Sequence, residues 1–180
     1  MDWKVLSSEY IVKHPYFTAR KDVCQMPDGK VVPAYFVVEL PKSVCAMAIT
    51  LEGKVILVKQ YRHPVAEVLI ELPGGFVDKG EDTRTAIARE LLEETGYEFS
   101  RLDEVGKVAG NPGVLSGFTH LFLATGGKKV AGQTLDANEQ IEIILSPLAT
   151  VKEMLAKNEF VQALHTSCLF YAFQKLEEDF

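Results

Sequence analysis

The stretch from Gly75 to Tyr97, GFVDKGEDTRTAIARELLEETGY, limits the fold of this chain more than any other part of the sequence. Between Asp82 and Thr95 it contains neither Gly nor Pro, and most of its residues favour helices. The acidic and hydroxyl side chains around Asp82 suit the exposed amides at a helix N-terminus. Gly96 lies where a residue with a left-handed backbone commonly ends a helix. We therefore expect a helix from Asp82 to Thr95.

Three carboxylates lie close together near the C-terminal end of this predicted helix. Glu93 follows Glu90 by three residues and Glu94 follows it by four, so all three side chains project into one neighbourhood. Like charges at these spacings each cost roughly 0.2–0.5 kcal/mol, and acids at a helix C-terminus oppose its dipole. Arg89 can reach Glu93 one turn further on, but one cation cannot neutralise three anions. A hard divalent cation, Mg²⁺ or alternatively Mn²⁺, would do so.

An acidic, solvated helix face is the alternative explanation of these carboxylates. The strand-like segment and the glycines around the helix favour the metal site. The stretch also resembles a known motif, the Nudix box: Gly, five residues, Glu, seven residues, Arg-Glu, an aliphatic residue, any residue, Glu-Glu, any residue, Gly and an aliphatic residue. The sole departure is Tyr97 at the last position, and Tyr is still largely apolar. The matching residues are Gly75, Glu81, Arg89, Glu90, Leu91, Glu93, Glu94 and Gly96.

The resemblance implies an α/β (α+β) fold: an α/β/α sandwich around a mixed β-sheet over residues 42–180, preceded by an antiparallel β-subdomain of residues 1–41. Turn residues Pro27-Asp28-Gly29 separate two strand-like segments and themselves predict an N-terminal hairpin. Thr150 and Glu153 form a capping box that predicts a helix start. The predicted strands are residues 16–26, 30–40, 44–50, 54–61, 104–110, 117–124 and 140–145, and the later helices are residues 150–156 and 160–176.

Length and composition exclude several classes of protein. At 180 residues and 47% apolar content, the chain can bury the core of one domain with a small appendage. A net charge of −6 provides no basic surface for nucleic acid. No segment is typical of a signal peptide or a membrane span, so we expect no membrane partner and a cytoplasmic location. The histidines, His165 included, show no ligand-like spacing and are expected to be packing or surface residues.

Residues outside the box indicate a substrate class. The order Gln60-Tyr61-Arg62, then Glu71-Leu72-Pro73-Gly74-Gly75, then the box is similar to the ADP-ribose pyrophosphatase and nucleotide-sugar branch of the Nudix family. That branch also tends to have a Pro after the box, here Pro112. Arg62 would offer a guanidinium fork to a diphosphate oxygen, and a surface salt bridge is the alternative. Gly74 replaces the Ala common in this branch, which a backbone role tolerates.

An acidic loop after the box resembles one that carries a water-assisting Glu in related enzymes. Glu139, two residues before the Ile that opens a strand, matches best, with a solvated acidic turn as the alternative. In this branch the N-terminal subdomain commonly crosses to a partner subunit and offers an aromatic residue that stacks on the base. Tyr16 and Phe17 are the candidates here, with core packing as the alternative. The resemblance thus implies a homodimer.

The resemblance also implies a role for each residue of the box. Glu90 and Glu94, with the carbonyl of Gly74, would hold the metal ion, and Glu93 would bind a second ion or orient water. Arg89 would fix Glu93 or the nearby backbone as a supporting catalytic group.

The implied reaction is Mg²⁺-dependent hydrolysis of a small-molecule nucleoside diphosphate sugar to a nucleoside monophosphate and a sugar phosphate. ADP-ribose is the first choice, followed by GDP-mannose and ADP-glucose. A Nudix hydrolase of nucleoside triphosphates or dinucleoside polyphosphates should lack the pattern of Arg62, Pro112 and Glu139. A non-catalytic Nudix sensor that binds a nucleotide sugar should have lost one of the box glutamates, and none is lost here.

Overall fold

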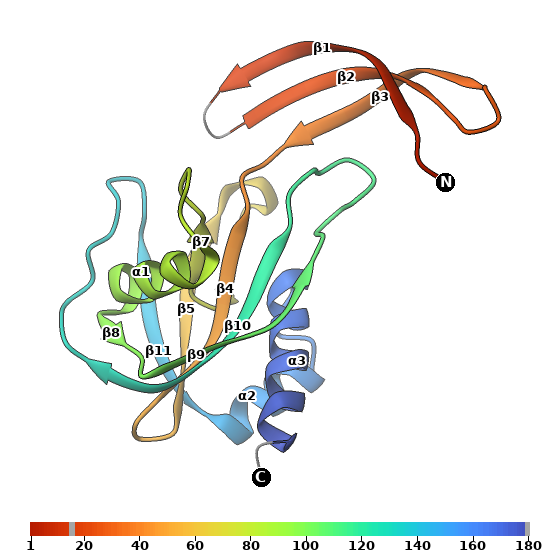
Figure 1. Ribbon diagram of the computed structural model, residues 1–180. Coiled ribbons are helices and arrows are strands. Elements are labelled where there is room, and N and C mark those ends of the chain that lie inside the picture. Colours follow the sequence, from red (N-terminus) through yellow and green to blue (C-terminus); the bar gives the residue numbers. More distant parts are fainter. Residues whose placement is uncertain (15–16, 179–180) are drawn as a thin grey trace. The chain divides into compact units, whose positions relative to one another are not determined.

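The computed structural model describes residues 1–14 and 17–178, and these divide into two compact units (Figure 1). The first unit contains Met1–Lys42 and Ala109–Phe118. The second contains Ser43–Val108 and the described chain from Thr119 onward. The Nudix-like box therefore lies wholly within the second unit. None of the described helices is long and apolar enough to cross a membrane.

The first unit is built on a three-stranded antiparallel sheet in the order β1-β2-β3. Its strands are β1 (Lys4–His14), β2 (Phe17–Gln25) and β3 (Val31–Glu39). The predicted hairpin is confirmed: Gly29 has φ +86° and its amide donates to the carbonyl of Met26 at 2.9 Å. Strand β1 was not predicted. All of its residues are exposed, so no alternation of buried and exposed positions marks it as a strand.

The second unit contains an eight-stranded mixed sheet, in which β11, β5, β4, β10 and β8 follow one another. Strand β6 pairs with β5, β7 with β4, and β9 with β10, and β4 runs parallel to β10. The short strands β6, β7 and β8 were not predicted because they span too few residues to show a period. The strands are β4 (Ser43–Thr50), β5 (Lys54–Arg62), β6 (Glu67–Glu71), β7 (Gly74–Phe76), β8 (Tyr97–Glu98), β9 (Arg101–Val108), β10 (Thr119–Lys129) and β11 (Ile141–Pro147).

Helices cover both faces of this sheet. Alternate residues of β4 point to opposite sides: Ala46 packs with Leu91 of α1 (Thr83–Thr95), and Met47 packs with Leu169 of α3 (Ala163–Glu178). The predicted α/β/α sandwich around a mixed sheet is confirmed. The structure also describes helix α2 (Leu148–Ala156) and a 3-10 turn, η1 (His63–Val65).

The predicted helix boundaries are correct for α1 and shifted for α2 and α3. The Asp82 side chain accepts hydrogen bonds from the amides of Arg84 and Thr85, as expected of a cap. Helix α2 begins at Leu148, directly after Pro147, so Thr150 and Glu153 lie inside the helix and form no capping box. Helix α3 begins at Ala163, three residues later than predicted. Because Pro fixes its own φ, it suits a helix start without a side-chain cap.

Gly96 should resist substitution more strongly than a glycine of the same conformation in open space. Gly96 has φ +75°, and a Cβ there would lie 2.2 Å from the carbonyl oxygen of Ala131. Gly53 has φ +72° with no atom within 4 Å of the same position. We expect Gly96→Ala to lower the free energy of unfolding by about 2–4 kcal/mol and Gly53→Ala by about 1 kcal/mol, measured by urea denaturation. Equal losses would show that the contact with Ala131 is unimportant.

Candidate active site

Arg89 connects the carboxylates of the box. Its Nη1 donates to Glu90 Oε1 at 2.9 Å and to Glu93 Oε2 at 3.0 Å. Its Nε and Nη2 donate to the two oxygens of Glu81, each at 3.1 Å, and Nη2 also donates to the carbonyl of Phe76 at 3.0 Å. One guanidinium therefore ties α1 to the loop before it and to β7. The expected contact between Arg89 and Glu93 is present, together with two further carboxylate partners.

Glu90 fits against the backbone of β7 because residue 75 is a glycine. A Cβ at Gly75 would lie 2.5 Å from Oε1 of Glu90 and 2.6 Å from Oε2. Burial raises the pKa of the Glu90 carboxyl, although Arg89 acts in the opposite direction. Gly75 thus leaves a space that a carboxylate occupies at the edge of the sheet.

Glu94 is the most deeply buried carboxylate of the box, with 6% of its surface exposed. Its Oε2 accepts a hydrogen bond of 2.9 Å from the amide of Gly74. Burial raises the pKa of Glu94 to about 8, against the lowering effect of this amide, and the charges of Glu90 and Glu139 raise it further. Gly74 has φ +152°, and a Cβ there would lie 2.1 Å from the carbonyl oxygen of Val44, so only glycine fits.

The oxygen atoms of these residues are of the kind that binds a divalent metal ion. Carboxylates and a backbone carbonyl are the oxygen ligands that Mg²⁺ and similar ions prefer. Burying carboxylates without a full set of counter-charges is unfavourable, and a cation would relieve it. Within residues 1–14 and 17–178, no three His, Cys, Asp or Glu side chains are grouped closely enough to enclose an ion. Arg89 bonds to one oxygen of Glu90 and one of Glu93, and each carboxylate has a second oxygen.

The loop that carries Glu139 runs along the C-terminal end of α1. The amide of Thr134 donates to the carbonyl of Glu93 at 2.8 Å. The side-chain Nε2 of Gln133 donates to the carbonyl of Glu94 at 2.8 Å and to that of Ile141 at 3.2 Å. This role of Gln133 could not be predicted, because a lone Gln in a polar loop has no distinguishing spacing. These bonds cap the carbonyls of α1 and hold the loop to the helix.

Glu139 itself is exposed, and its negative charge contributes to raising the pKa of Glu90 and of Glu94. Its Oε2 accepts a hydrogen bond from the amide of Asp136 at 3.2 Å. The structure therefore brings Glu139 within electrostatic reach of the box carboxylates. Whether it assists water stays a prediction.

Arg62 pairs with a buried carboxylate. Its Nη2 and Nε donate to Glu71 Oε2 at 2.6 Å and 2.9 Å, and Glu71 is 1% exposed. The positive charge of Arg62 also lowers the pKa of Glu94, which places Arg62 on the side of the box. A guanidinium held on one edge by a buried carboxylate has a fixed orientation. The expected contact with a diphosphate stays a prediction.

His165, at the start of α3, is buried and neutral. Its Nδ1 accepts a hydrogen bond of 3.3 Å from the amide of Leu72. Burial lowers the pKa of His165 to about 3, and the charge of Arg62 acts in the same direction. The sequence could not distinguish this residue from an ordinary packing histidine, because its partner lies far away in the chain.

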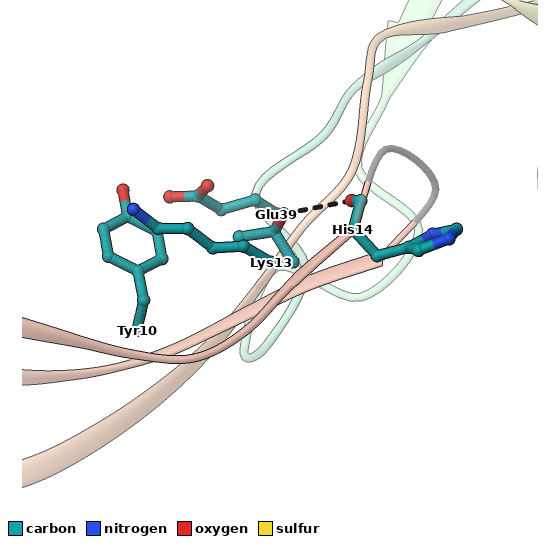
Figure 2. Close-up of a pocket in the computed structure, with 5 residues that line it drawn as sticks. Tyr10, Lys13, His14 and Glu39 are labelled. Atoms are coloured by element: carbon teal, nitrogen blue, oxygen red, sulfur yellow. Dashed lines mark hydrogen bonds between the residues drawn. The ribbon is translucent and has the colours of Figure 1, made fainter.

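Two of the remaining predicted site residues, Phe17 and Pro112, belong to the first unit, and Tyr16 lies outside the described residues. Phe17 is 47% exposed, so it is not a core residue of its own sheet. The first unit also has a groove of about 390 Å³, where Nζ of Lys13 lies 3.9 Å from the centre of the Tyr10 ring (Figure 2). The groove is lined by Tyr10, Lys13, His14, Thr18 and Glu39.

Comparisons with known proteins identify the same family as the resemblance of the box. The model of the NUDIX domain matches residues 39–164, and that of the nucleoside diphosphate sugar hydrolase N-terminal domain matches residues 3–38. The chain is 34% identical over 142 residues to the methanol dehydrogenase activator of Bacillus methanolicus, covering 78% of this chain and 76% of the relative. It is 31% identical over 167 residues to the ADP-ribose pyrophosphatase of Bacillus subtilis, covering 89% of each. A crystal structure described as an ADP compounds hydrolase has the same fold, with a TM-score of 0.84 at 22% identity over 99% of this chain and 96% of that one.

His165 should make the free energy of unfolding depend on pH. Its pKa is about 3 in the folded protein and near 6.5 in the unfolded chain, so the unfolded state binds the proton more readily. The stability is therefore complete above pH 6.5 and is lost as the pH falls from 6.5 toward 3. Between about pH 7.5 and pH 5 we expect a loss on the order of 2 kcal/mol from this group.

The measurement is urea denaturation of the protein and of His165→Asn at both pH values. The excess pH dependence of the unsubstituted protein is the contribution of His165, because Asn does not titrate. The same pH dependence in both proteins would contradict a neutral, buried His165.

Proposed function

Because the chain belongs to the Nudix family, we propose that it is a metal-dependent pyrophosphohydrolase of nucleoside diphosphate sugars. Enzymes of this family generally use divalent metal ions. Water would attack one phosphorus of the diphosphate and break the bridging P–O bond, giving a nucleoside monophosphate and a sugar phosphate. The observation that carries the proposal is the arrangement of Glu90 and Glu94 against the backbone of Gly74 and Gly75. ADP-ribose is the first candidate, since several relatives are named ADP-ribose pyrophosphatase.

The residues of the box would have different roles in binding the metal ion and orienting water. Glu90, Glu94 and the Gly74 carbonyl would hold Mg²⁺, and Glu93 would hold a second ion or orient water. When bound, the metal would offset the charge of the diphosphate and lower the pKa of the attacking water. Arg89 would keep Glu90 and Glu93 in place through the bonds described above.

Two residues outside the box would act on the substrate. Glu139 would accept a proton from the attacking water, because its carboxylate is exposed and near the other acids. Arg62, oriented by Glu71, would donate to a diphosphate oxygen. Phe17, Tyr16 and Pro112 stay candidates for contacts with the base or sugar.

Glu94→Gln should remove activity without unfolding the protein. The substitution keeps the shape of the side chain but removes the charge that would hold the metal. Substituting a residue that only supports a metal ligand typically costs roughly 10–100-fold. We expect kcat/KM to fall by more than this, because Glu94 would be a ligand itself. The assay measures phosphate released by a coupled phosphatase from a panel of nucleotide sugars with Mg²⁺.

Glu98→Gln is the matched control, since Glu98 is an exposed acid just past the same helix. It should keep the activity of the unsubstituted protein. Near-normal turnover in Glu94→Gln would overturn the metal assignment. Hydrolysis of nucleoside triphosphates alone, with no nucleotide sugar cleaved, would overturn the substrate class.

We also propose that the N-terminal subdomain, residues 1–41, forms a homodimer. Strand β1 exposes every one of its residues, and apolar side chains are numerous among them. Exposed apolar surface of this kind is typical of protein interfaces. The exposed apolar residues of β1 are Val5, Leu6, Tyr10, Ile11 and Val12.

Sedimentation should give twice the 20.0 kDa mass of one chain. Ile11→Lys should shift the protein toward the monomer, because a charge on β1 would be buried in the interface. Val161→Lys is the control, since Val161 is 57% exposed, close to the 56% of Ile11, but lies in the second unit. A 20.0 kDa species that does not change with concentration would reject the dimer.

A further inference from the structure

His165 is a polar, titratable residue in a layer of the sandwich that the proposed reaction does not use. It lies at the first turn of α3, on the face of the sheet opposite α1, and only 7% of its surface is exposed. Burying an imidazole is unfavourable unless it gains a hydrogen bond. The bond it makes is with the amide of Leu72, a residue that is 2% exposed. Without His165 the buried Leu72 amide would lose this hydrogen-bond acceptor, which is unfavourable for a donor shielded from water.

Leu72 leads directly into the backbone of the proposed metal site. The next residue, Pro73, accepts a hydrogen bond of 3.0 Å from the amide of Ala46 in β4. The residue after that, Gly74, donates to Glu94 of α1 at 2.9 Å. Three consecutive residues are thus fixed in turn by α3, by the sheet and by α1. His165 supplies the fixation from the α3 side.

The backbone of this segment has little room for adjustment. Gly74 adopts a conformation that favours glycine, and its Cα lies so close to β4 that a Cβ would clash with Val44 and with Cys45. Pro73, which lies between Leu72 and Gly74, has its φ fixed by its ring, so few free dihedral angles separate the Leu72 peptide from the Gly74 carbonyl.

We propose that His165 is a positioning residue, which orients the Leu72–Gly74 backbone so that the Gly74 carbonyl and Glu94 together receive a divalent cation. It acts through the backbone and touches neither the metal nor the substrate. The proposal rests on the proposed function, because it assumes a metal ion at this carbonyl. The imidazole is required as a hydrogen-bond acceptor at the position of Nδ1, and not for its size or charge.

The test compares two substitutions that differ in this acceptor. In His165→Asn, Oδ1 takes the place of Nδ1 and can accept from Leu72. In His165→Leu, the volume is largely kept but the acceptor is lost. Binding of Mn²⁺ alone, measured by electron paramagnetic resonance without substrate, reports the metal site directly. We expect His165→Leu to weaken Mn²⁺ binding by about tenfold or more, as the loss of other residues that support metal ligands does. We expect His165→Asn to weaken it by less than about threefold.

A control separates this effect from a loss of packing. Leu176→Ala removes apolar contacts near the C-terminal end of α3 and leaves the His165 acceptor of the Leu72 amide in place. It should lower the thermal midpoint without weakening Mn²⁺ binding. If His165→Leu does not fold, His165→Met takes its place, because Met adapts to irregular core space.

The outcomes are distinct. Unchanged Mn²⁺ affinity in folded His165→Leu, or equal weakening in the Asn and Leu variants, would overturn the role of His165 while the proposed function stands. Failure of the unsubstituted protein to bind Mn²⁺ and to cleave any nucleotide sugar would overturn the proposed function itself.

Discussion

The hydrogen bond between the Gly74 amide and the Glu94 carboxylate is the contact on which the site depends. It joins α1, which carries the acids, to Gly74 at the start of β7, whose carbonyl is the proposed backbone ligand. Both partners are placed by packing: Glu94 is nearly buried, and Gly74 lies against Val44 where no side chain fits. Burial raises the pKa of this carboxyl to about 8, although the Gly74 amide and the charge of Arg62 both favour its charged form.

Arg89 is the counter-charge that the structure itself provides for the box. Its pairs with Glu90 and Glu93 offset part of the repulsion among the acids toward the C-terminal end of α1, and its pair with Glu81 ties the helix to the loop before it. These pairs do not include Glu94. The positive charge of Arg62 lowers the pKa of Glu94, but by less than burial raises it. Burial outweighs this attraction, since the pKa of Glu94 stays raised.

Local signals predicted the parts of the fold that depend on neighbours in the chain. The cap at Asp82 and the left-handed Gly96 fixed both ends of the box helix, and the resemblance of the box to the Nudix family is confirmed by the NUDIX domain match. The pairing of Arg62 with Glu71 and the bond of His165 to Leu72 could not be predicted. Each depends on strands or helices that meet only in three dimensions. The exposed strand β1 lacked the alternation by which a half-buried strand is recognised.

Diffraction from crystals grown with Mn²⁺, recorded where manganese scatters anomalously, would locate the ion that Glu90, Glu94 and Gly74 are proposed to hold. We expect an anomalous peak about 2–2.3 Å from carboxylate oxygens of Glu90 and Glu94 and from the carbonyl oxygen of Gly74. We also expect Glu94 to keep its contact with the Gly74 amide. A peak elsewhere, or none at these three oxygens under saturating Mn²⁺, would contradict this assignment.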